Sequence, residues 1–245
     1  VDLGALGALK GIRRQGGAIV IGAMTPHAEV AASAEVERAI PALAALAGGI
    51  GDPLVRNRGT IGGSIANADP AADYPAGVVG LGATVVTNRR EIAADDFFLG
   101  LFETALEPGE IITAVRFPIP EAAGYCKLPQ PASRFALAGV FVAKTAGGVR
   151  VAVTGAGPSV FRLRDAEAAL GKNFDAAALG AITVRADDLN SDIHASAAYR
   201  ARSARRARRE SRPAARGRAR RRRAPAPTGG GSRRRASACR GCSSS

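Results

Sequence analysis

The chain has 245 residues, 47% of them hydrophobic and 4% aromatic, which is enough to build one or two ordinary cores. No apolar run of eighteen or more residues occurs, which argues against a membrane-spanning helix. The formal net charge of +13 is uneven, because residues 201–245 hold sixteen arginines and one acid whereas residues 1–200 are nearly neutral. The body of the chain is therefore not a general polyanion binder.

The first elements predicted are a strand over 18–24 and two helices. Thr25 is expected to cap the first helix, with Pro26 at its first position. Ser33 is expected to cap a second helix that ends at the Gly48-Gly49 pair.

Further elements alternate up to a break near residues 118–124, where two prolines and a glycine interrupt regular structure. Before the break we predict a helix at 75–81, strands at 83–87, 91–93 and 110–117, and a turn or helix at 95–99. After it we predict a strand hairpin, 135–144 with 149–154, turning at Gly147-Gly148, and helices at 165–170 and 175–179. The pattern gives a first domain over 1–120 and a small α+β domain over 121–200.

From Ala201 onward the apolar periodicity is lost, and we predict a disordered arginine-rich tail over 201–245. Three origins are open: out-of-frame translation of a GC-rich gene, which the abrupt change favours, a solvated functional tail, or an arginine arm that binds nucleic acid. The lone Cys239–Cys242 pair has no second pair beside it, so we assign it neither a zinc nor a redox role.

The segment from Arg56 to Tyr74 holds the densest set of ligand-type residues. It joins a glycine pair, small hydroxyls, an asparagine and two aspartates four residues apart. Glycines let a backbone approach a ligand closely and leave N–H groups free to face an anion. The segment therefore predicts a site for a phosphate-bearing cofactor, although Asp69 and Asp73 could instead cap the helix that follows.

This segment resembles the FAD-binding subunit of molybdenum hydroxylases, the medium subunit of carbon monoxide dehydrogenase and of bacterial xanthine dehydrogenase. The resemblance covers residues 1–200. Its central match is Arg58–Ser64 followed by Ala68–Asp73, and its supporting matches are 21–27, 108–112, 125–127, 132–136 and 192–200.

The resemblance implies an α+β fold: part of an FAD-binding domain of the vanillyl-alcohol-oxidase type, followed by a small C-terminal domain. It implies an electron-transfer subunit that takes electrons from a [2Fe–2S] small subunit and passes them through FAD to an external acceptor. A molybdopterin large subunit would complete a heterotrimer, expected to dimerise. Substrate chemistry would occur there, so no catalytic residue and no metal site is expected on this chain.

The resemblance also implies roles for individual positions. The backbone amides of five residues would line the FAD pyrophosphate and ribityl chain: Thr60, Ile61, Gly62, Gly63 and Ser64. Asn67, Asp69 and Asp73 would reach polar parts of the cofactor from the same loop. Ile111 or Ile112 would pack near the adenine, and Lys127 would lie near the flavin ring, although a solvated lysine is the alternative reading.

The sequence departs from the family pattern at both ends. An earlier glycine-rich loop, the first half of the pyrophosphate grip, is absent before Val1, and the arginine tail replaces the expected C-terminal helix. These departures motivate a second hypothesis, a cofactor-free remnant that docks to partners; an arginine-tail nucleic-acid binder is the third. Without a visible signal peptide or a disulfide framework, we expect a cytoplasmic protein.

Overall fold

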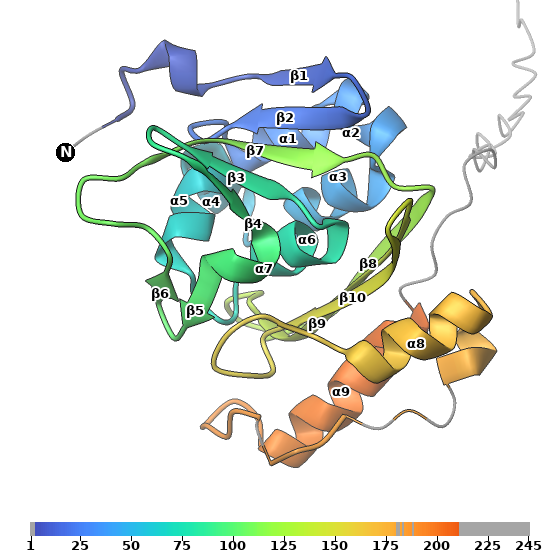
Figure 1. The fold of residues 1–245 in the computed structure, drawn as a ribbon. Coiled ribbons are helices and arrows are strands. Elements are labelled where there is room, and N and C mark those ends of the chain that lie inside the picture. The colour runs from blue at the N-terminus through green and yellow to red at the C-terminus, as the bar shows by residue number, and fades with distance from the viewer. Residues whose placement is uncertain (1–2, 180–181, 183, 188, 211–245) are drawn as a thin grey trace, which may run out of the picture.

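The computed structural model describes residues 3–179, 182, 184–187 and 189–210. Two antiparallel sheets are arranged around a group of short helices (Figure 1). Helices α3 (Pro41–Gly48) and α6 (Tyr74–Leu81) contact one side of the second sheet. Helices α8 (Arg164–Lys172) and α9 (Ala197–Glu210) contact its strands from the other side.

The first sheet has the strand order β1-β2-β7-β3-β4 and is antiparallel throughout. Its central strand β7 alternates buried and half-buried residues, the pattern expected when one face packs on a core. The strands are β1 (Ile12–Gln15), β2 (Ala18–Gly22), β3 (Thr84–Thr87), β4 (Glu91–Ala93) and β7 (Ile112–Pro118).

Short helices form the layer behind this sheet (Figure 1). Several of them begin at a proline or a side-chain cap and end at a glycine, and these residues set the helix boundaries. They are α1 (His27–Ala32), α2 (Ala34–Ala39), α3 (Pro41–Gly48), α4 (Pro53–Arg58), α5 (Ile61–Asn67), α6 (Tyr74–Leu81) and α7 (Ala94–Phe97). A small hairpin of β5 (Phe98–Gly100) and β6 (Glu103–Thr104) follows α7.

The second sheet has the order β11-β10-β9-β8. Its central strand β9 is buried on both faces over most of its length, because helices cover each side. The elements are β8 (Ala122–Pro129), β9 (Ala136–Thr145), β10 (Gly148–Thr154), β11 (Phe161–Arg162), α8 (Arg164–Lys172) and α9 (Ala197–Glu210), with 3-10 turns at Gly7–Leu9 and Ala176–Leu179.

The two sheets share a continuous core. Phe141 and Ala152 of the second sheet belong to the same buried cluster as Ile19 and Val85 of the first. A second cluster lies between the outer face of β9 and β10 and the helices α8 and α9. The interface between the halves is therefore hydrophobic and well packed, and polar contacts add to it.

Three local expectations need correction. Thr25 does not cap a helix, because α1 begins at His27 and the Thr25 hydroxyl instead bonds both backbone groups of Gly11 at 3.0 and 3.2 Å. Ser33 does cap a helix, through the Val36 amide at 3.3 Å, but Pro41 divides the expected single helix into α2 and α3.

The third correction concerns the basic tail. Helix α9 extends to Glu210, ten residues into the segment predicted to be disordered. The expectation that the tail takes the place of a C-terminal helix is therefore wrong for residues 201–210. Its buried face recurs at helical spacing and packs against β9 and β8 through Arg200, Ser203, Ala204 and Ala207. The sequence showed no clear apolar periodicity here, because the buried face of α9 consists of small residues and an arginine, without large apolar side chains. Residues 211–245, with both tail cysteines, lie outside the described residues.

Candidate functional site

Helix α5 carries the glycine segment and lies behind the first sheet. Thr60 is its N-cap, with a hydroxyl that accepts a hydrogen bond from the Gly63 amide at 3.2 Å. Ile61 and Ile65 are fully buried on one face of the helix. The motif therefore begins with an ordinary cap and an apolar anchor, which fix the helix on the core.

Gly62 is required for packing. A Cβ atom there would lie 2.5 Å from the Ala23 Cβ, and the Gly62 amide donates to the Ala23 carbonyl at 2.8 Å. The Ile61 amide likewise donates to the Thr25 carbonyl at 3.1 Å. These two amides join α5 to the turn after β2 and do not face a ligand.

The Gly63 and Ser64 amides are also donors within the chain, both to Thr60. Four of the five backbone amides that were predicted to line the FAD pyrophosphate therefore donate to other groups of this chain. Among the described residues, the Thr60 amide has no acceptor. The outward face of α5 carries small or polar groups, Gly63, Ser64 and Asn67.

The segment that follows α5 is bonded tightly to the second sheet. The Pro70 carbonyl accepts from the Gly155 amide at 2.7 Å, and the Ala71 carbonyl accepts from the Ala136 amide at 3.2 Å. The buried Thr154 hydroxyl bonds the Pro70 and Ala72 carbonyls at 3.0 and 2.6 Å. The position of the glycine segment therefore depends on the second sheet.

Asp73 makes the next contact across this interface. Its carboxylate is buried and accepts hydrogen bonds from the Tyr125 hydroxyl and from the Lys127 ammonium, the latter at 2.9 Å. Burial raises the pKa of Asp73, while Lys127 and Tyr125 act in the opposite direction. Asp73 occupies the N-cap position of α6, but its side chain makes no capping bond.

The structure thus joins two of the predicted residues that are 54 positions apart, Asp73 and Lys127. Lys127 is not a solvated lysine, because its side chain is 11% exposed and also donates to the Arg134 carbonyl at 2.9 Å. A charge buried in this way is held only when partners surround it.

Asp69 and Ile112 lie apart from this ion pair. The Asp69 carboxylate accepts from the Ala71 amide at 2.8 Å and shapes the turn after α5 without capping a helix. Asp69 also lines a pocket of about 270 Å³ with Arg200 and residues of the segment 130–137. Ile112 is 6% exposed and begins strand β7, where it contributes to the core.

Two buried polar side chains beside the motif were not predicted as site residues. His27 packs on Gly59, where a Cβ would come within 2.6 Å of its Nε2 atom, and its ring lies 5.2 Å from that of Tyr74. Within the described residues, His27 Nδ1 and the Tyr74 hydroxyl have no hydrogen-bond partner. Burial lowers the pKa of His27 to about 4, so the ring is neutral at physiological pH.

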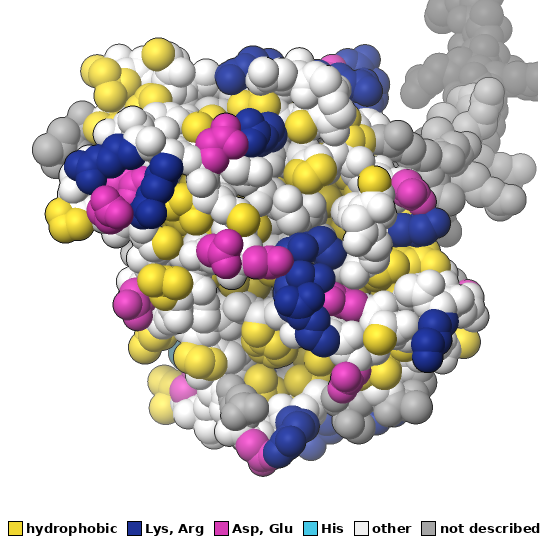
Figure 2. Space-filling view, in the orientation of Figure 1, with side chains coloured by type: hydrophobic (Ala, Val, Ile, Leu, Met, Phe, Trp, Pro, Cys, Tyr) yellow, Lys and Arg dark blue, Asp and Glu magenta, His cyan; other side chains and the backbone are white. Residues whose placement is uncertain are grey.

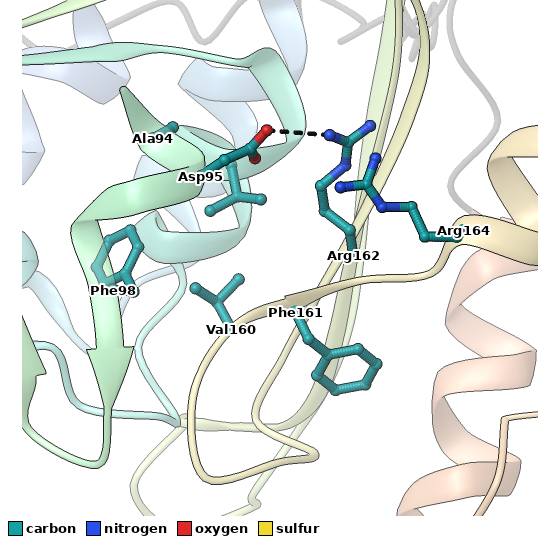
Figure 3. A pocket seen from close by; sticks show the side chains of 8 residues that line it. Ala94, Asp95, Phe98, Val160, Phe161, Arg162 and Arg164 are labelled. Atoms are coloured by element: carbon teal, nitrogen blue, oxygen red, sulfur yellow. Dashed lines mark hydrogen bonds and ion pairs between the residues drawn. The ribbon is translucent and has the colours of Figure 1, made fainter. Parts of the chain in front are cut away.

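A second polar contact joins helix α7 to the second sheet at the surface. Asp95 of α7 pairs with Arg150 of β10 and with Arg162 of β11, the latter at 3.0 Å. Figure 3 shows the pair with Arg162. A pocket of about 260 Å³ opens beside it and is lined on one side by Phe98 and Val160. Basic and acidic side chains are interspersed over this face (Figure 2), so it offers no field of a single sign.

Two negative findings apply to the described part of the chain. No group of three or more His, Cys, Asp or Glu side chains is placed to hold a metal ion. No helix there combines the length and the apolar character needed to cross a bilayer.

Comparison with known proteins defines the class. Residues 1–120 match the family described as the FAD binding domain in molybdopterin dehydrogenase. The chain is 36% identical over 227 residues to the carbon monoxide dehydrogenase medium chain of Hydrogenophaga pseudoflava, covering 84% of this chain and 79% of that one. It is also 36% identical over 214 residues to the nicotine 6-hydroxylase medium subunit of Paenarthrobacter nicotinovorans, covering 82% and 76%.

Solved structures agree with these matches. Carbon monoxide dehydrogenase from Hydrogenophaga pseudoflava superposes with a TM-score of 0.73 at 36% identity, covering 83% of this chain and 77% of that one. Quinoline 2-oxidoreductase from Pseudomonas putida 86 gives 0.74 at 28% identity, covering 83% and 76%.

The class is thus an FAD-binding oxidoreductase subunit with an α+β fold. The chain belongs to the molybdopterin dehydrogenase FAD-binding family, among the medium subunits of molybdenum hydroxylases. The predicted family, fold class and cofactor are confirmed. The side chains present fit a polar, phosphate-bearing cofactor such as FAD, because the outward face of α5 is small and polar and the segment after it holds the charged Asp73–Lys127 pair.

Proposed function

We propose that this chain is the electron-transfer subunit of a molybdenum hydroxylase complex, receiving electrons from a [2Fe–2S] subunit and delivering them to an external acceptor. Its partners would be that small subunit and a molybdopterin large subunit, in a heterotrimer that dimerises in the cytoplasm. When bound, FAD supplies the redox chemistry, while the protein supplies binding, orientation and electrostatics.

The observation that carries the proposal is the rigid attachment of the glycine segment to both sheets. Gly62 fixes α5 against the turn after β2, and the carbonyls of residues 70–72 fix the following loop against β9 and β10. A cofactor site built on such supports keeps its geometry during repeated turnover.

We assign the chain's residues two kinds of role in the site. Thr60, Ser64 and Asn67 would hold phosphate and hydroxyl groups along the outward face of α5, while Ile61, Gly62 and Gly63 shape the surface beneath them. Asp73 and Lys127 would bind polar atoms of the ring. Asp69 would border the site from the turn after α5, whereas Ile112 is buried in the core and is assigned no contact with the cofactor. No residue of this chain is assigned a catalytic role on the substrate.

Flavin binding by the full chain tests the proposal. We expect added FAD to give a bound flavin absorption spectrum and a stoichiometric quench of flavin fluorescence. Asn67→Leu should raise the FAD dissociation constant at least tenfold, because a polar contact is lost and a bulky group covers the α5 face. Gln15→Leu, at an exposed position on β1, is the matched control and should bind FAD as the wild type does.

Two results would count against this function. A colourless protein whose spectrum does not respond to added FAD would support a cofactor-free docking subunit instead. A flavin-loaded chain that is not reduced in the assembled complex when substrate is added would reject the electron-transfer route while leaving FAD binding intact.

A further inference from the structure

The Tyr125 hydroxyl reaches the buried Asp73 carboxylate from strand β8. Tyr125 and Lys127 are two residues apart on this strand, so both side chains project from the same face of the sheet. Both converge on Asp73, with the tyrosine at Oδ1 and the lysine at Oδ2. The two oxygens of one carboxylate are thus divided between two donors.

Strand β9 is shaped to admit this tyrosine. Gly139 lies opposite Lys127 in the β8–β9 register, and a Cβ at Gly139 would lie 2.6 Å from the Tyr125 hydroxyl oxygen. The Tyr125 ring is held beside Phe141, with 6.0 Å between ring centroids. The hydroxyl therefore occupies a space that exists only because position 139 has no side chain.

Because Tyr125 occupies one carboxylate oxygen of Asp73 and Lys127 the other, the position of the Lys127 ammonium group is fixed. An ammonium group has three donors, and Lys127 uses two of them, on Asp73 Oδ2 and on the Arg134 carbonyl, each at 2.9 Å. Within the described contacts, the third donor remains for another acceptor. If Asp73 could rotate, the direction of this donor would not be set.

We propose that Tyr125 is a positioning residue of the cofactor site: it holds the Asp73 carboxylate, and Asp73 in turn orients the Lys127 ammonium toward the cofactor. This rests on the proposed function, in which Asp73 and Lys127 contact bound FAD. Tyr125 itself acts through these two residues.

Tyr125→Phe in the full chain tests the role, because it removes one oxygen and keeps the ring on Phe141. Tyr199→Phe is the matched control, since Tyr199 is 42% exposed on α9. Two quantities are measured: the FAD dissociation constant, and the rate at which Lys127 is reductively methylated without FAD, followed by peptide mass spectrometry. Lys10 and Lys172, both exposed, serve as internal references for methylation.

In the Tyr125→Phe variant we expect Lys127, but not Lys10 or Lys172, to be methylated severalfold faster than in the wild type. We expect the variant to bind FAD about tenfold more weakly, with little change in thermal unfolding.

Unchanged methylation and unchanged affinity would overturn the role of Tyr125. Faster methylation with unchanged affinity would also overturn it, because Lys127 would then be freed without consequence for the cofactor. A wild-type chain that binds no FAD would instead contradict the proposed function, whatever the methylation shows.

Discussion

Gly62 lies so close to Ala23 that a methyl group at position 62 would approach the Ala23 Cβ to 2.5 Å. The first glycine of the pair therefore serves close packing of helix on strand turn. Its neighbour Gly63 faces outward, where a Cβ would meet only the Thr60 hydroxyl at 3.0 Å. The two adjacent glycines therefore have different roles: Gly62 allows close packing on Ala23, and Gly63 lies on the outward face of α5.

The two glycines should respond differently to alanine. Gly62→Ala forces α5 away from Ala23 and should lower the free energy of unfolding by about 1–3 kcal/mol, the usual cost of overpacking. Gly63→Ala should change it by less than about 1 kcal/mol, because better helix propensity offsets a tight contact. Urea unfolding measures both, and equal effects would contradict the packing role of Gly62.

His27 should make stability depend on pH in the weakly acidic range. Its pKa is lowered from 6.5 to about 4 by burial, so the unfolded chain takes up a proton first as pH falls. The contribution is complete above pH 6.5 and is lost as the pH falls toward 4. In His27→Phe this part of the pH dependence should disappear.

The measurement is the free energy of unfolding in urea at a series of pH values from 7.5 to about 4.5. His194→Phe is the control, since His194 is exposed. If His27→Phe declines as steeply with falling pH as the wild type does, His27 is not the responsible group.

Glu110 should make the stability of the chain depend on pH in a more acidic range than His27 does. Its side chain bonds the Arg90 guanidinium at 3.1 Å, the Thr87 hydroxyl at 2.7 Å and the Glu107 amide at 2.9 Å. These donors lower the pKa of Glu110 from 4.5 to about 2, with the Arg90 hydrogen bond the largest cause. Its stabilisation is therefore present above pH 4.5 and is lost as the pH falls toward 2.

Glu110→Gln should be less stable than the wild type at pH 7 and should lose less on acidification below pH 4.5. Glu107→Gln, at a side chain 57% exposed, is the control and should follow the wild-type curve closely. Circular dichroism during acid titration compares the three proteins. Parallel curves for Glu110→Gln and the wild type would show that the cluster does not set the acid response.

Arg200 should be essential for anchoring helix α9 to the second sheet. It is 4% exposed and donates to the Leu137 and Gly155 carbonyls at 2.9 and 2.7 Å, and to Asp192 at 2.6 Å. Arg200→Leu should destabilise the chain by about 2–3 kcal/mol, because charge-assisted hydrogen bonds are lost and buried carbonyls are left without donors. Thermal unfolding measures this effect.

Arg202→Leu on the same helix is the matched control. Arg202 is exposed and packs loosely over the Tyr199 ring, with 6.0 Å from its Cζ atom to the ring centroid. We expect a change within about 0.5 kcal/mol, as for other surface substitutions. Comparable losses for both variants would mean that α9 is not anchored through Arg200.

Much of the architecture could be read from local pattern. The largely apolar segments at 18–24, 135–144 and 149–154 each contain a strand, and the Gly147-Gly148 turn joins a hairpin as predicted. These strands could be predicted because the preference of a segment for strand structure depends on the pattern of adjacent residues. Local signals failed where a contact distant in sequence decided the outcome, as at Thr25, whose hydroxyl is taken by Gly11.

The sequence by itself determined the family, the cofactor and the segment that carries them, because the order of small and polar residues at 58–73 is a local property. Only the tertiary structure decided what each residue does there. It directed the Gly62 amide to Ala23 and joined Asp73, at the start of α6, to Tyr125 and Lys127 on strand β8. Burial and hydrogen-bond partners depend on how distant segments pack, and no short stretch of sequence states that packing.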